Sequence, residues 1–294
     1  MKSLTQARLS LEDIDDSQKR LRDFKFIDLF AGIGGFHYAL SKLGGECVMA
    51  SEIDAKARKT YLANQSCENM IGDINDISPV DVPEHDVLCA GFPCQPFSQA
   101  GFKKGFEDAR GTLFFNIYEI AKAKRPKALF LENVRFLLKH DDGKTFSVIK
   151  EMIESLGYSF HPFIVKACDH GVPQFRPRLF MICLRDGKQY TPPQPRELKL
   201  SMSDVLGGHC EREIGFTLRV GGRRSPIAGR HNWDGYIVDG EERRLTIQQG
   251  AVMQGLPEDF SFPVSDKEAM KQLGNSVAVP AIYDYARELL KSIC

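Results

Sequence analysis

Short apolar runs alternate with helical stretches along most of the chain. From Phe24 onward the strand-sized runs are FKFIDLF, ECVMAS, DVLCAGF, KALFLENV and, after a longer gap, LFMICLR. The segments GFHYALSKLGG and DAKARKTYLA lie between the first of these runs and are expected to form helices. Because strands that alternate with helices build sheets covered on both faces, the pattern predicts an α/β fold with a doubly wound, mostly parallel sheet.

Breaks in this pattern divide the chain into four predicted segments. Residues 1–23 are a polar, charge-mixed leader that we expect to form a helical cap on the surface. Residues 24–187 contain the strands and form the main domain. Residues 188–262 open with YTPPQP, are dense in Gly and Arg, and lack long periodic apolar segments, which indicates a small separate domain. Residues 263–294 end in VPAIYDYARELLKSI, an amphipathic helix expected to return to the sheet.

Composition and charge narrow the classes of protein. A chain of 294 residues with 43% hydrophobic content can bury a full core. Its 8 cysteines include no C-x-x-C pair and none beside a His at metal-ligand spacing, so we expect reduced thiols and no metal. No apolar run is long enough to cross a membrane or to act as a signal peptide, which predicts a cytoplasmic protein. The net charge of zero means that a nucleic-acid surface requires local segregation of charge, which occurs near residue 220.

The first chemical feature is the glycine-rich turn in FIDLFAGIGGF. Gly32, Gly34 and Gly35 allow a sharp turn and close approach to a ligand, and Asp28 and Phe30 lie at the end of the preceding strand. A nucleotide-like ligand fits this arrangement, although such a cluster can also do no more than close a tight turn between a strand and a helix.

Carboxylates at the ends of the next strands sharpen this prediction. Glu52 follows the glycines by about 20 residues, where doubly wound folds place an acid on ribose hydroxyls. Asp73 could accept a hydrogen bond from an adenine amino group or be an ordinary turn aspartate, and both readings stay open. Because the glycine spacing differs from G-x-G-x-x-G, an adenosine-bearing cofactor is favoured over a dinucleotide.

A cysteine between two prolines is the candidate nucleophile. Cys94 follows the strand DVLCAGF, and Pro93 and Pro96 stiffen the turn that presents its thiol at the ligand-binding edge of the sheet. The following segment, SQAGFKKGFEDARGTLFF, carries Lys103 and Arg110 and predicts a mobile lid that touches phosphates. A solvated charged loop is the alternative.

Further strand-end groups complete the predicted site. Glu132 ends KALFLENV and would share the sheet edge with Cys94, where burial could raise its pKa and make it a proton donor. Arg176 and Arg178, two residues apart, would lie on one face of an extended segment together with Gln174. Two guanidinium groups aimed one way suit a planar polar substrate or a phosphate, whereas a surface ion pair is the alternative.

In their order along the chain, these motifs resemble those of the DNA (cytosine-5) methyltransferases of bacterial restriction and modification systems. The resemblance rests on FIDLFAGIGGF, GFPCQPFS, LENV, QFRPRLF, RRLT with QGLPEDF, and QLGNSVAVP, and runs from about Phe24 to the end of the chain apart from the variable recognition region. It implies an S-adenosylmethionine-dependent methyltransferase fold with a small target-recognition domain. It also implies a monomer that acts on double-stranded DNA in the bacterial cytoplasm and nucleoid, alongside a restriction endonuclease that it need not touch.

The resemblance assigns roles to the reactive residues. Cys94 would attack C6 of a flipped cytosine, and Glu132 would protonate or hydrogen-bond N3. Arg178 and Arg176 would hold the O2 edge and the neighbouring backbone while the lid at residues 95–111 closes. The methyl group would pass from S-adenosyl-L-methionine, leaving S-adenosyl-L-homocysteine, to C5 of the cytosine.

The resemblance also implies a cofactor pocket. Its residues would be Asp28, Phe30, Ala31, Gly32, Gly34, Gly35, Glu52, Ile53, Asp73, Ile74, Pro93, Asn275 and Val277. One departure is Ile53, where many relatives carry an aromatic residue against the adenine ring. A second departure is Gln248-Gln249-Gly250, where the family usually has Arg-Glu and a small residue, and it puts the packing of the recognition domain in doubt.

The recognition region is rich in arginine. The segment from Ile214 to Trp233 holds no acid. The residues expected to contact DNA are Ser98, Lys103, Arg110, Gln174, Thr217, Arg219, Gly221, Gly222, Arg223, Arg224 and Arg230. Arginine can fork onto guanine or hold phosphates, and the sequence does not separate these roles; we expect one or two of the arginines to specify bases.

Three other functions would explain part of the sequence. A nicotinamide oxidoreductase would explain the glycine turn and Glu52 but leaves Cys94 and the basic loop idle. A silent nucleic-acid-binding regulator would leave Cys94 and Glu132 without a task. An RNA-directed relative would use the same chemistry, and the substantial basic recognition region argues against it.

Overall fold

The computed structural model describes residues 23–93, 113–221 and 224–293. The leader and the predicted lid fall outside these ranges, apart from Asp23. Within the described residues, seven strands form one sheet in the order β3-β2-β1-β4-β5-β7-β6. The strands are β1 (Phe24–Leu29), β2 (Gly45–Ser51), β3 (Met70–Ile71), β4 (Val87–Gly91), β5 (Ala128–Val134), β6 (Tyr158–Lys166) and β7 (Pro177–Arg185).

The sheet confirms the predicted mostly parallel arrangement. The neighbours from β3 to β5 are all parallel, whereas β7 runs antiparallel to β5 and to β6. The chain builds outward from β1 in both directions, with β2 on one side and β4 on the other. Because helices must diverge at this switch point, a crevice opens outside the carboxyl ends of β1 and β4.

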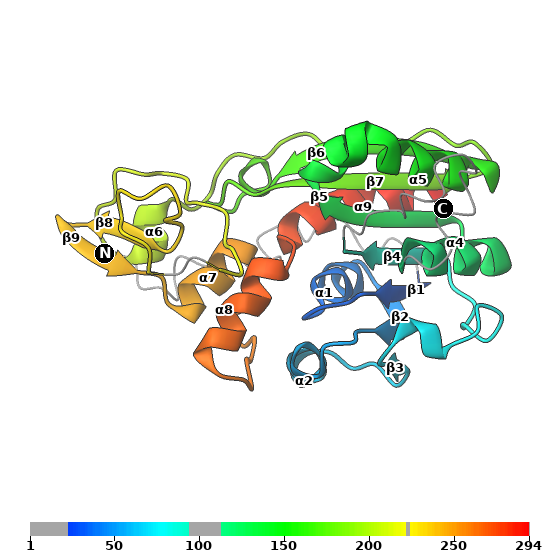
Figure 1. Cartoon of the computed structure of the whole chain (residues 1–294), viewed down its shortest axis with the longest axis horizontal. Helices are drawn as coiled ribbons and strands as arrows, with labels where there is room; N and C mark the ends of the chain where they lie inside the picture. The colour runs from blue at the N-terminus through cyan, green and yellow to red at the C-terminus, as the bar shows by residue number, and fades with distance from the viewer. Residues whose placement is uncertain (1–22, 94–112, 222–223, 294) are drawn as a thin grey trace.

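Helices cover both faces of the sheet, as Figure 1 shows. The helices that accompany the sheet are α1 (Gly35–Lys42), α2 (Ala55–Asn64), α4 (Leu113–Lys124), α5 (Lys144–Ser155) and α9 (Val279–Ile293). In the described part of the chain, the 3₁₀ segments η2 (Ile74–Asp76), η4 (Arg135–Gly143) and η5 (Ala167–Asp169) lie in the connections after β3, β5 and β6. The strands alternate: Phe26 and Phe130 share a core with α1 and α9, whereas Ile27 and Leu129 share one with α4 and α5. Strands β1 and β5 are therefore apolar on both faces, as fully covered parallel strands require.

A smaller group of elements gathers at one end of the molecule, beyond the sheet (Figure 1). It contains α6 (Met202–Leu206), the hairpin of β8 (Gly235–Val238) and β9 (Glu241–Arg244), and α7 (Ile247–Gln254). Helix α8 (Asp266–Asn275) leads from this group back toward the sheet, where α9 packs on α1. The domain boundaries themselves stay a prediction.

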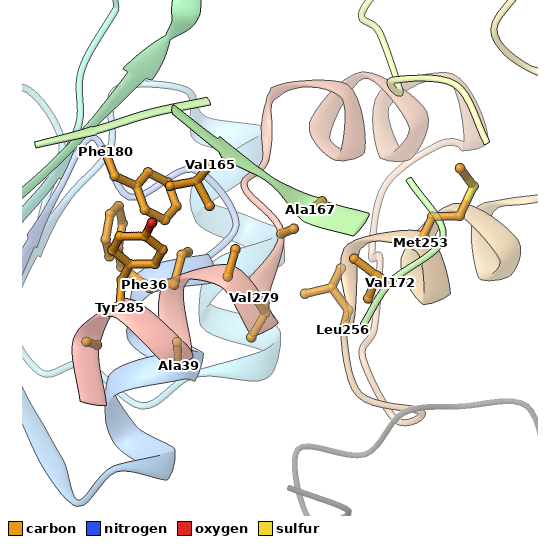
Figure 2. Close-up of a cluster of buried hydrophobic side chains, with 14 of the residues drawn as sticks. Phe36, Ala39, Val165, Ala167, Val172, Phe180, Met253, Leu256, Val279 and Tyr285 are labelled. Carbon is orange, nitrogen blue, oxygen red and sulfur yellow. The ribbon is translucent and has the colours of Figure 1, made fainter. Parts of the chain in front are cut away.

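One hydrophobic core joins the two ends, as the close-up in Figure 2 shows. On the sheet side, the ring of Tyr285 from α9 meets Phe180 of β7 edge-on at 5.2 Å between centroids. On the other side, Met253 of α7 and the adjoining Leu256 pack in the same cluster, with Val172. Because the core is continuous, the small group is held in a fixed position relative to the sheet.

Candidate active site and cofactor pocket

A cavity of about 540 Å³ opens at the carboxyl edge of the sheet. Its walls come from the glycine turn after β1, the ends of β2, β4 and β5, and the end of α8, with Arg178 contributed by β7. This volume lies in the range of small-molecule sites, and the location is the crevice that the strand order predicts.

The glycine turn holds strained backbone at the mouth of the cavity. Phe30 adopts a left-handed φ of 57°, unusual for a residue with a bulky side chain. Gly34 has a φ of 87° and begins α1, and a Cβ there would lie 3.0 Å from the ring of Tyr61. Such strain is typical of ligand-binding turns, and both conformation and space favour glycine at position 34.

Glu52 organises the turn from the neighbouring strand. One carboxylate oxygen accepts a hydrogen bond from the Gly32 amide at 2.8 Å and the other accepts from the Asp54 amide at 2.8 Å. Each carboxylate oxygen keeps a further lone pair, so Glu52 can also accept hydrogen bonds from ribose hydroxyls.

Arg58, which was not predicted as a site residue, holds the backbone at Glu52 and Ile53. Its Nη1 donates to the carbonyl oxygens of Glu52 at 2.6 Å and of Ile53 at 2.9 Å. The side chain reaches back from α2, where Asp54 caps the helix through the amides of Lys56 and Ala57. Only the N-cap aspartate could have been found from the sequence, because an Asp directly before a helical pattern is a start signal.

The cavity fits an adenosine-bearing cofactor in its chemistry. Ile53 lines it with 69% of its surface exposed, an apolar wall that a flat aromatic ring would cover. Asn275 and Val277 line the opposite wall beside Lys271, whose Nζ lies 3.5 Å from Asp54. A carboxylate for hydroxyls, an apolar wall for a base and a glycine turn therefore stand in one cavity.

Four expected cofactor residues do not line this cavity. Asp28 is buried beneath it and accepts a hydrogen bond from the His37 amide at 3.3 Å, and burial raises the pKa of its carboxyl. Gly34 serves the turn geometry. Asp73 accepts hydrogen bonds from the amide and the side chain of Asn75, as expected of a turn aspartate. Ile74 is buried in the core. The other expected residues, Phe30, Ala31, Gly32, Gly35, Glu52, Ile53, Pro93, Asn275 and Val277, line it.

Glu132 and Arg178 form an ion pair at the inner end of the cavity. Glu132 lies beside Gly91 in the β4–β5 register, and its Oε1 is 3.1 Å from Nε of Arg178. Only 7% of Glu132 is exposed, and this burial raises its pKa although the positive charges of Arg178 and Arg176 act to lower it. The adjacent Asn133 donates to the Phe92 carbonyl at 2.9 Å and so holds the end of β4 against β5.

The structure corrects the expectation that Arg176 shares a face with Arg178. Arg176 is 1% exposed and its guanidinium donates to the carbonyls of Leu218 at 2.8 Å, Gly274 at 2.7 Å and also Ser276. The reason is local. The Arg176 amide bonds the Gln174 carbonyl at 3.0 Å, so the backbone turns before β7 begins and the alternation of an extended segment does not apply.

The structure also contradicts the expectation that Gln174 faces DNA. Its side chain is 0% exposed, donates to the Met253 carbonyl at 2.8 Å and accepts from the Leu218 amide at 3.1 Å. Thr217 donates its hydroxyl proton to the Phe175 carbonyl. The segment before β7 is thus an anchor for the start of the recognition region.

Several predicted residues lie outside the described ranges. These are Cys94, Ser98, Lys103, Arg110, Gly222 and Arg223. Cys94 directly follows Pro93, which lines the cavity. Among the described recognition residues, Arg219, Gly221, Arg224 and Arg230 are exposed.

The departure at Gln248-Gln249-Gly250 is accommodated by α7. Gln249 and Thr246 form a reciprocal capping box, with the Thr246 hydroxyl accepting from the Gln249 amide and the Gln249 side chain accepting from the Thr246 amide. A Cβ at Gly250 would lie 3.0 Å from Leu273 of α8, so glycine permits the close packing of the two helices.

No helix in the described part of the chain is both long and apolar enough to cross a bilayer. In residues 23–93, 113–221 and 224–293, no cluster of three or more His, Cys, Asp or Glu side chains is arranged to hold a metal ion.

Comparison with known proteins places this geometry in a family. A family model described as C-5 cytosine-specific DNA methylase matches residues 24–205 and 209–291. The type II methyltransferase M.NlaX of Neisseria lactamica is 39% identical over 90% of this chain and 96% of its own length. The type II methyltransferases M.HhaI of Haemophilus parahaemolyticus and M.HpaII of Haemophilus parainfluenzae are each 36% identical, over 95% and 98% of this chain and 98% and 95% of their own lengths.

Solved structures share the fold at lower identity. A DNMT2 mutant of Spodoptera frugiperda aligns with a TM-score of 0.70 and 18% identity over 90% of this chain and 99% of its own. A putative prophage-encoded DNA modification methyltransferase from E. coli aligns with a TM-score of 0.69 and 19% identity over 92% of this chain and 99% of its own. The predicted α/β methyltransferase fold is therefore confirmed.

Proposed function

We infer the reaction from one premise: the chain belongs to the C-5 cytosine-specific DNA methylase family and is a DNA (cytosine-5) methyltransferase. We propose that it methylates C5 of a cytosine flipped out of a specific double-stranded sequence, through a covalent bond between Cys94 and C6. The observation that carries this proposal is the buried pair of Glu132 and Arg178 at the inner end of a cavity that Pro93, the residue before Cys94, also lines.

The chemistry follows from what these side chains can do. The Cys94 thiolate forms a bond to C6, and the ring electrons displaced by this addition move toward N3 and C5. Glu132, whose burial raises its pKa, donates a proton or a hydrogen bond at N3. Arg178 orients Glu132 and donates to the O2 edge, where negative charge develops. After methylation, loss of the C5 proton and departure of the Cys94 thiolate restore the aromatic ring.

The cofactor proposed for the cavity is S-adenosyl-L-methionine, which supplies the methyl group and leaves as S-adenosyl-L-homocysteine. Glu52 would accept from the ribose hydroxyls, and Ile53 would pack on the adenine ring. The glycine turn at Gly32 and the opposite wall at Asn275 and Val277 would enclose the remainder. Fit is supported by the carboxylate, the exposed apolar wall and the strained turn, all of which face one cavity.

The setting proposed for the enzyme is the bacterial cytoplasm. Its substrate is duplex DNA, and unstacking the target base costs a few kcal/mol that contacts from the recognition region must offset. Since the relatives are type II methyltransferases, we propose a restriction endonuclease of the same system as the functional partner, with no direct contact needed and with this chain acting as a monomer.

Two linked experiments test the reaction. Purified protein is incubated with S-adenosylmethionine and a random-sequence duplex pool, with tRNA as competitor, and methylated cytosines are mapped by bisulfite sequencing. A duplex carrying 5-fluorocytosine at the mapped site should then trap a covalent complex at Cys94, because fluorine at C5 prevents the final elimination.

Matched variants make the trapping decisive. Cys94→Ala should bind DNA but neither methylate nor trap it. Cys168→Ala removes another free and partly exposed thiol, and this variant should both methylate DNA and form the trapped complex. Methyl transfer by Cys94→Ala would refute the covalent mechanism, and methylation of tRNA in preference to duplex DNA would refute the substrate.

A further inference from the structure

The arginine-rich recognition loop spans residues 219–231, of which the structure describes 219–221 and 224–231. In its described part, the backbone at Arg224 is held by several hydrogen bonds. Arg224 is exposed and adopts a left-handed φ of 66°. Its amide donates to both carboxylate oxygens of Asp234, at 3.1 and 3.2 Å. The carbonyl of the next residue, Ser225, accepts from Nη1 of Arg244 at 2.9 Å. The chain is therefore pinned on both sides of the Arg224 Cα.

The group that pins Arg224 is itself costly to bury. Asp234 is 0% exposed, and its Oδ1 lies 3.1 Å from Nη1 of Arg244. Removing a carboxylate from water is unfavourable unless hydrogen bonds and a counter-charge compensate it. The compensating donors include the Arg244 guanidinium and the Arg224 amide, so the buried charge helps to hold the left-handed turn.

Neighbours of Asp234 bind two further points of the described part of the recognition loop. Trp233, fully buried, donates from Nε1 to the Gly221 carbonyl at 2.7 Å. Asn232 donates to the Ile227 carbonyl at 3.1 Å. Three consecutive side chains thus bind the loop before, at and after Arg224.

The start of the loop is tied to the active site. Gln174 accepts from the Leu218 amide, and Arg176 donates to the Leu218 carbonyl. Arg176 lies two residues before Arg178, which pairs with Glu132. Leu218, directly before the loop, is therefore anchored by hydrogen bonds to the segment that leads into Arg178.

Base reading and phosphate binding require different precision. A guanidinium that forks onto O6 and N7 of guanine must be placed in the plane of the base, whereas a phosphate accepts donors from many directions. Strained backbone persists where the surroundings over-determine it, and such positions gather at functional sites. Of the described arginines in the loop, Arg224 has a left-handed φ, whereas Arg219 and Arg230 do not, and Nε of Arg230 donates to its exposed neighbour His231 at 3.0 Å.

We propose that Arg224 reads a guanine of the target sequence in the major groove, and that Asp234 is the positioning residue that holds it. This inference rests on the proposed function, since it concerns the DNA site that the enzyme methylates. It selects one arginine from a group that the sequence alone leaves undivided.

The test uses Arg224→Gly in the full chain. Glycine adopts a φ of 66° without strain, so this variant removes the guanidinium and keeps the turn, and its melting temperature should equal or exceed that of the wild type. Arg243→Ala is the matched control, because Arg243 is a half-exposed arginine of the same small group that pairs with Asp239 at 3.7 Å.

Methylation of a random-sequence duplex pool gives the result. Wild type and Arg243→Ala should show the same sequence pattern. Arg224→Gly should lose preference at one G·C position by about 5- to 150-fold while the other positions keep theirs. An unchanged pattern would overturn the inference, and so would a uniform loss at all sites accompanied by a shallower salt dependence, which marks a phosphate contact. If the wild type methylates no duplex, the proposed function fails and this inference fails with it.

Asp234→Asn tests the positioning role. The amide keeps an acceptor for the Arg224 N–H but loses the charge that faces Arg244. It should relax the same G·C position, by less than Arg224→Gly does. Relaxation at a different position would refute the positioning role. If this variant does not fold, the pattern of Arg224→Gly decides the inference.

Discussion

Replacing Arg176 by lysine separates a structural role from a catalytic one. The guanidinium binds the Leu218 carbonyl through Nη1 and the carbonyls of Gly274 and Ser276 through Nη2. A lysine ammonium is a single point and cannot serve carbonyls on both sides, so one or two bonds are lost. Because a hydrogen bond from a charged donor contributes about 1.5–3 kcal/mol, the free energy of unfolding should fall by about 2–5 kcal/mol. For a chain of this size, that corresponds to a melting temperature lower by roughly 3–8 °C.

The matched variant is Arg178→Lys. Lysine keeps a positive charge beside Glu132 but loses the planar donor set, so the single-turnover methylation rate should fall roughly 100-fold or more, with a smaller loss of stability. Calorimetry and single-turnover kinetics on a cognate duplex measure both variants. If Arg176→Lys melted within about 1 °C of the wild type, less than the smallest shift expected, yet transferred no methyl groups, Arg176 would be catalytic and the structural reasoning would be refuted.

Three further predictions concern separate parts of the site. Glu132→Gln should slow single-turnover methylation by about 10²- to 10⁴-fold; since burial raises the pKa of Glu132, wild-type activity should decline as pH rises through that pKa, and a decline that persists in the variant would contradict the assignment. Burial lowers the pKa of His37 from 6.5 to about 4, so as pH falls the unfolded chain binds this proton before the folded chain does. About 3 kcal/mol of the free energy of unfolding should therefore be lost between pH 6.5 and pH 4. In denaturant titrations at these two pH values, the loss should be smaller by this amount in His37→Gln than in the wild type. Arg58→Gln should weaken S-adenosylhomocysteine binding about 10-fold by calorimetry, because the Glu52 and Ile53 carbonyls lose their donor, whereas equal affinity would exclude a positioning role.

Among the strands that the sequence predicted, β1, β4, β5 and β7 are buried along most of their length, whereas β2 is buried only in its second half. Strands such as β4 and β5 appear in the sequence as continuous apolar runs, because residues such as Leu88 and Leu129 are fully buried. Strand β6 was missed because YSFHPFIVK mixes polar and exposed positions and contains a proline. Its place at the edge of the sheet tolerates all three, and no local pattern could reveal that β7 pairs with it antiparallel.

The sequence predicts the position of a candidate site residue correctly when that residue lies at the end of its strand. Glu132, Glu52 and the glycine turn follow this rule, since the carboxyl ends of parallel strands meet at one edge. Arg176 and Gln174 do not, because their partners are backbone atoms distant in the sequence. Arg176 bonds Gly274, 98 residues away, and such pairings are decided by the folded chain alone.

Helix α8 contacts both the proposed cofactor cavity and the start of the proposed recognition loop. After the recognition region, α8 returns to form a wall of the cavity, and it is bound to α2 on the opposite wall: Thr60 donates to Gln272 at 2.9 Å. On its other side, α8 touches the start of the recognition loop so closely that a Cβ at Gly274 would lie 2.5 Å from the carbonyl carbon of Arg219. Any side chain at position 274 must therefore displace the loop or tilt the helix. Since α8 also lines the cavity, a displacement of the helix that moves the proposed DNA-binding loop should also change the space in the proposed cofactor cavity.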